Sequence, residues 1–189
     1  MRKLTLSELG RMNIEQHKQA PKLPVVVVLD NLRSQHNIGS VFRTADAFRL
    51  ESISLCGITA TPPHREIQKT ALGATESVLW HYFEKTQEAI ITLRGKGYFI
   101  VAIEQTVGSI QLDSFKLPET PGIGIVFGNE VSGVDQQIIE LVDACVDIPQ
   151  FGTKHSLNVA VSAGIVIWEI FNKLSDIYPE RLQKEPPKN

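Results

Sequence analysis

The run of apolar residues at positions 25–29 is the feature that most limits how this chain can fold. Four valines and a leucine follow one another, so neither side of this segment carries a polar side chain. Such runs occur in parallel strands whose sheet is covered by helices on both faces. The run therefore predicts a buried strand in an α/β domain.

The rest of the chain alternates between strand-like and helix-like patterns. Short runs rich in β-branched and aromatic residues predict further strands at residues 53–57, 78–83, 98–103, 123–127 and 145–148. Apolar residues at helical spacing predict helices at residues 38–48, 65–72, 84–94, 135–142 and 156–171. This alternation indicates a mostly parallel sheet with helices on both faces.

Length and composition fit a single domain of this class. The 189 residues suffice for one α/β core and are short for two. We expect residues 1–23 to form an N-terminal helical extension that ends near Pro21 and Pro24. We expect residues 24–175 to form the domain, and residues 176–189 a tail whose end has the composition of a disordered segment.

The two cysteines and the first residues bear on where the chain works. Cys56 and Cys145 lie far apart, each in an apolar run, which predicts two buried free thiols rather than a disulfide. We expect no metal site, because metal ligands cluster at short spacing. The chain opens on charged and polar residues, and no apolar run approaches the ~20 residues that cross a bilayer. We therefore expect a cytoplasmic protein without membrane contact.

The net charge of −2 argues mildly against a nucleic-acid partner, because dedicated nucleic-acid domains usually carry a positive excess. Basic residues of a local face are nevertheless present: Arg33, His36, Arg43, Arg49, His64, Arg65 and Lys69. Charge alone favours an ordinary solvated surface for them. An RNA partner has to be argued from a more specific feature.

Three polar loops follow predicted strands at their carboxyl ends, where open parallel sheets bind ligands. They are residues 31–37, 128–133 and 149–158. Neither a Walker P-loop nor a Gly-x-Gly-x-x-Gly pattern follows the first strand, which disfavours a phosphate-cradling nucleotide site. The residues alone thus indicate a polar ligand crevice in a doubly wound domain.

The same loops carry three motifs in order. Residues 37–48 read NIGSVFRTADAF, residues 125–134 read IVFGNEVSGV, and residues 148–164 read IPQFGTKHSLNVAVSAG. In order and spacing they resemble the three motifs of the SpoU/TrmH family of RNA 2′-O-ribose methyltransferases, over roughly residues 24–172. Residues 71–74 (ALGA) resemble a lesser family signature. Within the family, the third motif and the helix after it look most similar to enzymes that methylate the D-loop guanosine of transfer RNA.

The resemblance implies the SPOUT methyltransferase fold, an α/β domain with a trefoil knot near its carboxyl end. A knot is contrary to the usual topological rule, and the strand and helix pattern does not predict it. The resemblance also implies S-adenosylmethionine as methyl donor and a homodimer through helices near the knot. The implied substrate is structured RNA, with transfer RNA favoured over ribosomal RNA, and not DNA.

Carried over residue by residue, Gly128, Ile148 and Leu157 match positions whose backbone holds the methyl donor. The loop around Gln105 and Thr106 is expected to complete that pocket. Adenine needs apolar walls and a few backbone partners, which suits these residues. Plain core packing is the ordinary role for Ile148 and Leu157, and it is compatible with donor binding.

Arg43 matches the family's catalytic arginine, and four polar residues match positions around it. A guanidinium stays protonated at neutral pH, so we expect Arg43 to grip the target phosphate and stabilise alkoxide charge rather than act as a base. Whether Arg43 also relays the proton stays open from the sequence. We expect Glu130 to orient Arg43. Two other roles for Glu130 are accepting a proton and capping the helix predicted at residues 135–142.

The remaining matched polar residues are Asn37, Ser156 and Asn158. Ser156 and Asn158 are expected to order the substrate end of the crevice. Asn37 and Ser156 are also expected to be the N-caps of the helices at residues 38–48 and 156–171. Because only about 20 residues precede the first strand, we expect RNA to be held by the catalytic domain, its tails and the dimer partner.

Three other functions stay open from the sequence. One changes only the substrate, to ribosomal RNA. A second is a non-catalytic RNA-binding module with the same fold, although such a module is expected to have lost some of the matched polar residues Arg43, Glu130, Ser156 and Asn158. A third is a flavodoxin-like small-molecule enzyme, against which the missing phosphate loop argues.

Overall fold

The structure, a computed structural model, describes residues 1–5 and 7–175 and contains one seven-stranded sheet. The strands are β1 (Leu23–Asp30), β2 (Leu50–Cys56), β3 (Leu79–Phe83), β4 (Phe99–Ile103), β5 (Ile110–Gln111), β6 (Ile123–Phe127) and β7 (Ala144–Asp147). Their order is β3-β2-β1-β6-β4-β7-β5, and every neighbouring pair is parallel. The expected parallel α/β sheet is confirmed.

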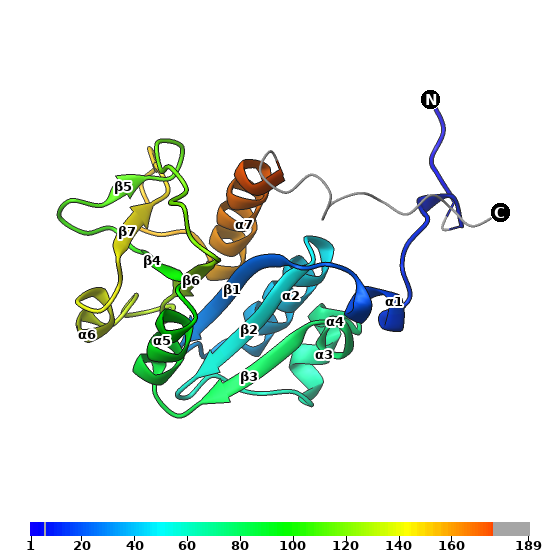
Figure 1. Ribbon diagram of the computed structural model, residues 1–189, viewed down its shortest axis with the longest axis horizontal. Coiled ribbons are helices and arrows are strands. Elements are labelled where there is room, and N and C mark those ends of the chain that lie inside the picture. The colour runs from blue at the N-terminus through cyan, green and yellow to red at the C-terminus, as the bar shows by residue number, and fades with distance from the viewer. Residues whose placement is uncertain (6, 176–189) are drawn as a thin grey trace.

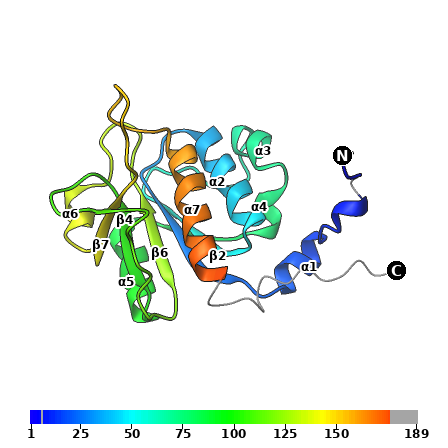
Figure 2. The same ribbon diagram turned by 90° about the horizontal axis from the view of Figure 1, so that it is seen from above.

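Helices cover both faces of this sheet (Figures 1 and 2). One face carries α2 (Gln35–Ala47), α3 (Arg65–Ala71), α4 (Ala74–Ser77) and α7 (Val159–Ser175). The other carries α5 (Thr86–Gly95) and α6 (Gln136–Ile139). In the described part of the chain, no helix has the length and apolar character needed to cross a membrane.

The alternation of side chains along β1 explains its continuous apolar run. Val25, Val27 and Leu29 pack into the core beneath α2 and α7. Val26 and Val28 point the other way, into the core beneath α5 and α6. Every residue of β1 is buried, because successive side chains of a strand point to opposite faces and both faces are covered.

The amino-terminal segment differs from the single helix expected over residues 1–20. It contains a short 3₁₀ helix, η1 (Ser7–Leu9), and a separate helix α1 (Ile14–Gln19). Asn13 starts α1 through a capping box, in which its side chain accepts from the Gln16 N–H and the Gln16 side chain accepts from the Asn13 N–H. The apolar periodicity predicted one helix, but a capping residue inside it begins a new one.

Smaller differences concern the ends of elements. The short elements α4 and β5 were not predicted, and α6 is four residues long rather than the eight expected at residues 135–142. The final helix begins at Val159, three residues later than predicted. The expected tail at residues 176–189 lies outside the described residues.

Both cysteines are free, as predicted. Cys56 is buried at the end of β2, whereas Cys145 in β7 is only partly buried. Burial raises the pKa of the Cys56 thiol to about 12. Cys56 is therefore a neutral core residue rather than a nucleophile.

The two-layer core yields a stability prediction. Phe42 of α2 is fully buried under the sheet, so we expect Phe42→Ala to lower the free energy of unfolding by about 3–5 kcal/mol in urea titrations. Ile91 of α5 is exposed, and Ile91→Ala is expected to change it by no more than about 0.5 kcal/mol. Equal losses in the two variants would contradict this account of the core.

Candidate active site

Three polar loops meet at the carboxyl edge of the sheet. Residues 31–34 follow β1, residues 128–135 follow β6, and residues 148–158 follow β7. β1 and β6 are neighbours, and β4 lies between β6 and β7. The long loop between β7 and α7 projects beyond the sheet (Figure 2). The sheet order therefore brings together the three segments that carry the motifs.

Glu130 binds the amino end of α2. Its carboxylate accepts hydrogen bonds from the backbone N–H groups of Arg33 and Ser34, each at 3.0 Å, and from Asn37 Nδ2 at 3.1 Å. The expected contact with Arg43 is absent among the contacts of the described residues. Unpaired N–H groups at a helix start attract carboxylates, so Glu130 fixes the helix that carries Arg43 rather than the guanidinium itself.

These contacts set the ionisation of Glu130. Partial burial raises its pKa, but the Arg33 and Ser34 N–H groups, its own backbone N–H and the Asn37 amide together lower it below the ordinary 4.5. The carboxylate is thus charged at neutral pH. A carboxylate with a lowered pKa is a weak proton acceptor, which argues for an anchoring role over a basic one. It does not cap α6 either, because Asp135 does so.

Asn37 and Asn158 join the first motif to the third. Asn158 Nδ2 donates to Asn37 Oδ1 at 3.2 Å, while Asn158 Oδ1 accepts from the Ala160 N–H at 2.9 Å and so caps α7. The predicted caps were therefore wrong. Ser34 caps α2 in place of Asn37, whose own N–H donates to the Ser34 hydroxyl, and Ser156 lies exposed in the preceding loop. Glu130, Asn37 and Asn158 form one hydrogen-bonded chain.

Arg43 lies about 1.7 turns beyond Asn37 along α2, on the solvent side of the helix. Its side chain is exposed and lines a surface cavity of about 500 Å³ between α2 and α3. No described residue forms an ion pair with its guanidinium. A charged fork-shaped donor in such a position is suited to bind a phosphate.

The expected donor-binding residues lie on the loops after β4, β6 and β7. Gln105 Nε2 donates to the His155 carbonyl at 3.2 Å, which ties the β4 loop to the loop before α7. Thr106 forms a turn with Ser109, its carbonyl accepting from the Ser109 N–H and hydroxyl. Ile148 is partly buried against the core, and Leu157 is exposed.

Gly128 allows a close approach of two backbone segments. A Cβ at Gly128 would meet the backbone of Gly133 and Val134. The close approach of these backbone segments keeps the loop after β6 compact.

Sequence reasoning missed three residues that hold these loops. Glu104 accepts from the Gln105 and Val134 N–H groups, both at 2.9 Å. Asn129 Nδ2 donates to the Asn31 carbonyl at 2.7 Å, which links the β6 loop to the β1 loop. Asn31 in turn has a left-handed backbone, with φ 55°. Their position one or two residues after a strand was the available signal.

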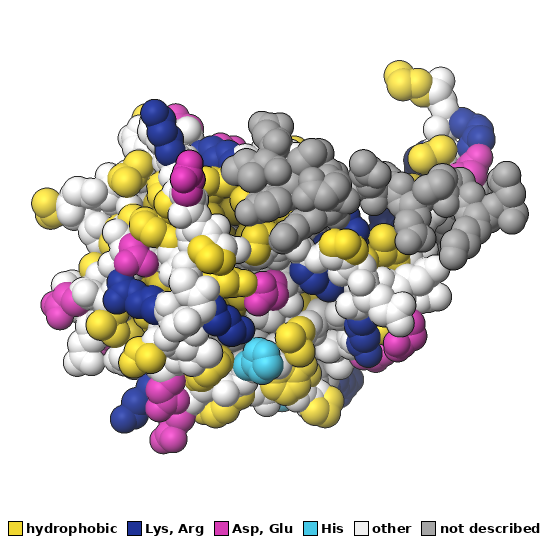
Figure 3. All heavy atoms as spheres, viewed as in Figure 1, with side chains coloured by type: hydrophobic (Ala, Val, Ile, Leu, Met, Phe, Trp, Pro, Cys, Tyr) yellow, Lys and Arg dark blue, Asp and Glu magenta, His cyan; other side chains and the backbone are white. Residues whose placement is uncertain are grey.

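The surface on the side of the sheet that carries α5 is mixed in charge. Figure 3 shows acidic and basic side chains interspersed there, with apolar side chains between them. The two cations that line the cavity between α2 and α3, Arg43 and Lys69, belong to the other side of the sheet. The net charge of −2 thus accompanies a mixed surface on the viewed side.

Most of the chain matches the model of a known protein family. The model of the SpoU rRNA methylase family matches residues 24–168. The chain belongs to this family. The match runs from β1 into α7, and it includes all three loops of the site. The resemblance seen in the motifs is confirmed.

Curated relatives agree with the SpoU assignment. A TrmH family tRNA/rRNA methyltransferase of Staphylococcus saprophyticus is 30% identical over 160 residues, which cover 85% of this chain and 63% of that protein. Its counterpart in Staphylococcus aureus is 27% identical over 164 residues, covering 87% and 65%. This SpoU family chain therefore spans slightly less than two thirds of the length of these relatives.

Solved structures agree with the fold. The AdoMet-bound rRNA methyltransferase from Sinorhizobium meliloti has a TM-score of 0.74 and 28% identity, covering 85% of this chain and 60% of that one. The A. aeolicus TrmH/SpoU tRNA modifying enzyme has a TM-score of 0.78 at 22% identity, covering 91% and 85%. The SpoU methyltransferase fold is confirmed, and its trefoil knot stays a prediction for this chain.

The pKa of Glu130 yields a pH prediction. Folding lowers this pKa below 4.5, so the unfolded chain binds the proton more readily than the folded one. The charged carboxylate therefore stabilises the fold above about pH 4.5, and this stabilisation is lost as the pH falls through the pKa of the folded protein. We expect Glu130→Gln to unfold more easily near pH 7 and to lose less stability on acidification to about pH 3. Denaturant titrations at several pH values measure this, and parallel pH curves for the two proteins would contradict it.

Proposed function

We propose that this chain is an S-adenosylmethionine-dependent RNA methyltransferase that transfers a methyl group to a ribose 2′-hydroxyl. The observation that carries the proposal is the chain of hydrogen bonds from Glu130 through Asn37 to Asn158, which joins the three family motifs and fixes the helix that presents Arg43. We assign the activity to residues 24–175, with residues 1–23 and 176–189 as extensions.

We propose that the loops after β4, β6 and β7 hold the methyl donor. Ile148 and Leu157 supply apolar walls, Gln105 and Thr106 close one side, and Gly128 contributes its backbone while its missing Cβ leaves room for Gly133 and Val134. When bound, S-adenosylmethionine supplies an electrophilic methyl group on a sulfonium. The residues named here position it and exclude water from it.

In the proposed reaction, Arg43 stabilises negative charge on the substrate. The attacking 2′-hydroxyl becomes a better nucleophile as its proton passes to solvent water, and a guanidinium beside it and its phosphate stabilises the negative charge left on the oxygen. Glu130 and Asn37 set the position of Arg43 by fixing the start of α2. Ser156 and Asn158 order the substrate end, since Asn158 contacts both Asn37 and the first turn of α7.

As substrate we propose transfer RNA, at the D-loop guanosine, ahead of ribosomal RNA, and we place this reaction in the cytoplasm. The motif that runs from Ile148 into α7 supports transfer RNA. The names of the curated relatives include both RNAs, and the S. meliloti structure is an rRNA methyltransferase.

The test is transfer of labelled methyl from S-adenosylmethionine to unmodified transfer and ribosomal RNAs, followed by alkaline hydrolysis. A 2′-O-methyl group blocks cleavage at its own linkage, so label in an alkali-resistant dinucleotide supports ribose methylation and names the RNA. Label in a mononucleotide would overturn the ribose assignment. Donor binding without transfer to either RNA would overturn both proposed substrates.

Removal of Arg43 separates its role from donor binding. We expect Arg43→Ala to lower methyl transfer about 100- to 1,000-fold, because a donor aimed at developing charge is lost, while the Kd for S-adenosylmethionine is unchanged. Arg43→Lys keeps the charge without the planar fork, and its rate of methyl transfer is expected to lie between those of the wild type and Arg43→Ala. Calorimetry and single-turnover transfer measure these effects. Equal losses of donor binding and transfer would contradict the assigned role.

We propose further that the chain is a homodimer through α7. Val161, Ile165 and Trp168 form an exposed apolar stripe on this helix, and Trp168 is 52% exposed although it packs against Phe48 and Phe171. An apolar stripe this long on a helix that already buries its other side is typical of a protein interface. A second copy of the chain supplies an equal stripe to cover it.

A charge in the stripe tests the dimer. We expect Ile165→Glu to sediment as a single chain, because association would bury an unpaired carboxylate. The matched control is Ile91→Glu, an exposed isoleucine of α5 on the other face of the sheet, which is expected to keep the wild-type mass. Analytical ultracentrifugation measures both, and a wild-type protein of single-chain mass would contradict the proposal.

A further inference from the structure

The helices α2 and α3 pack closely and form a groove. Gly39 makes this approach possible, because a Cβ there would meet Thr70 and the Ile67 carbonyl. Beside this contact the two helices enclose a cavity of about 500 Å³, open to solvent. Its lining residues are Ser40, Arg43, Thr44, Ala47, Phe48, Lys69 and Thr70.

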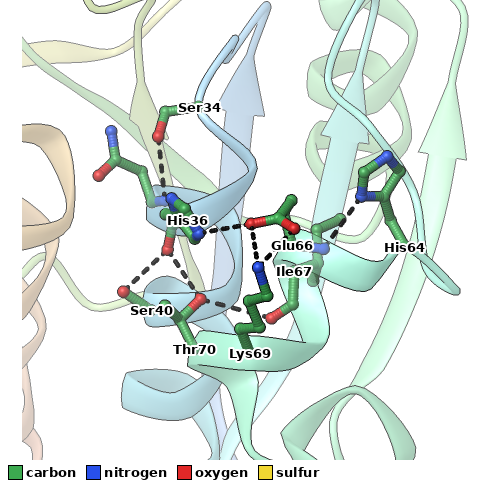
Figure 4. Close-up of polar contacts among 9 residues, drawn as sticks. Ser34, His36, Ser40, His64, Glu66, Ile67, Lys69 and Thr70 are labelled. Carbon is green, nitrogen blue, oxygen red and sulfur yellow. Dashed lines mark hydrogen bonds and ion pairs between the residues drawn. The ribbon is translucent and has the colours of Figure 1, made fainter.

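The hydroxyl groups of the groove already have acceptors. The hydroxyls of Ser40 and Thr70 both donate to the His36 carbonyl at 2.9 Å, and that of Thr44 donates to the Ser40 carbonyl at 3.1 Å. Figure 4 shows Ser40 and Thr70 converging on His36. The side-chain donors of the lining that are not bonded to a backbone carbonyl are those of the two cations, Arg43 and Lys69.

A ligand that matches this lining accepts hydrogen bonds and carries negative charge. Phosphodiester groups have both properties, whereas a neutral base or sugar has no charge to pair with the two cations. Arg43 and Lys69 lie on different helices, so their charges reach the same cavity from two sides. The groove therefore fits a nucleic-acid backbone better than it fits a base.

Lys69 is paired within its own helix. Its Nζ contacts both oxygens of Glu66, at 2.7 and 2.9 Å, and Glu66 also binds His36 Nε2 at 2.9 Å (Figure 4). The Lys69 side chain is 51% exposed and that of Glu66 31%. Ion pairs this exposed are weak, so Lys69 can exchange Glu66 for a phosphate at small cost. Glu66 would then keep His36 as a partner.

We propose that Lys69 is a second RNA contact, which binds a backbone phosphate next to the nucleotide addressed by Arg43, and that Glu66 holds Lys69 in the RNA-free protein. This inference rests on the proposed function, because it takes RNA as the substrate. Arg43 lies about 9 Å along α2 from Asn37, since six residues rise about 1.5 Å each. RNA bound at Arg43 is within the same cavity as Lys69, because both side chains line it.

The proposal predicts opposite effects for two neighbouring residues. We expect Lys69→Gln to weaken binding of a fluorescein-labelled, unmodified transfer RNA transcript about 3- to 10-fold and to reduce the slope of log K against log salt by about 1. We expect Glu66→Gln to tighten binding about 2- to 3-fold, because it frees Lys69 and removes a charge that repels phosphate. Fluorescence anisotropy at several salt concentrations measures both.

Matched controls remove the same charges elsewhere. Lys85→Gln and Glu88→Gln change exposed residues at the start of α5, on the other face of the sheet, and are expected to leave the Kd within about twofold. Thermal melts verify folding. If Lys69→Gln does not fold, Glu66→Gln alone decides, because a merely structural role predicts weaker rather than tighter binding.

The outcomes separate this inference from the proposed function. A Lys69→Gln variant that binds like Lys85→Gln, or a Glu66→Gln variant that binds more weakly than wild type, would overturn the inference even if methyl transfer is found. The absence of binding by the wild-type chain would overturn it as well. Conversely, the predicted pair of shifts without methyl transfer would support the groove and count against the proposed reaction.

Discussion

Burial of β1 on both faces is the constraint on which the rest of the structure depends. Its odd-numbered residues form part of one core and its even-numbered residues part of the other, so both helical layers are held by the same five side chains. β1 also pairs with β2 and β6. Its carboxyl end leads directly into α2, and the position of Arg43 is thereby tied to the centre of the domain.

The site itself is held by bonds between side chains and backbone rather than by packing. Glu130 binds the start of α2, Asn129 binds the loop after β1, and Glu104 binds the loop after β6. Each of these residues belongs to one loop and contacts another. Polar loops at a solvent-exposed edge bury little apolar surface, so such cross-links are the main source of their order.

Six of the seven strands, the main helices and the buried stripe of α2 followed from the sequence, because they depend on apolar periodicity that only one packing satisfies. The caps did not. Ser34, Asn37, Ser156 and Asn158 are all capable of capping, and tertiary contacts decide between them. The hydrogen-bond partners of Glu130 could not be predicted either, since they are backbone N–H groups, which nearly every residue has whatever its side chain.

The side chain of Asn158 contacts two different helices. Its oxygen caps the start of α7, and its NH₂ group donates to Asn37 of α2. A partner that restrains α7 therefore lowers the conformational entropy that is lost when a ligand fixes the Asn37 side chain. By thermodynamic reciprocity, a ligand that fixes Asn37 strengthens the association of whatever covers α7 by the same free energy. If α7 is the dimer interface proposed above, occupancy of the crevice and assembly are linked equilibria, joined through the Asn158 amide group.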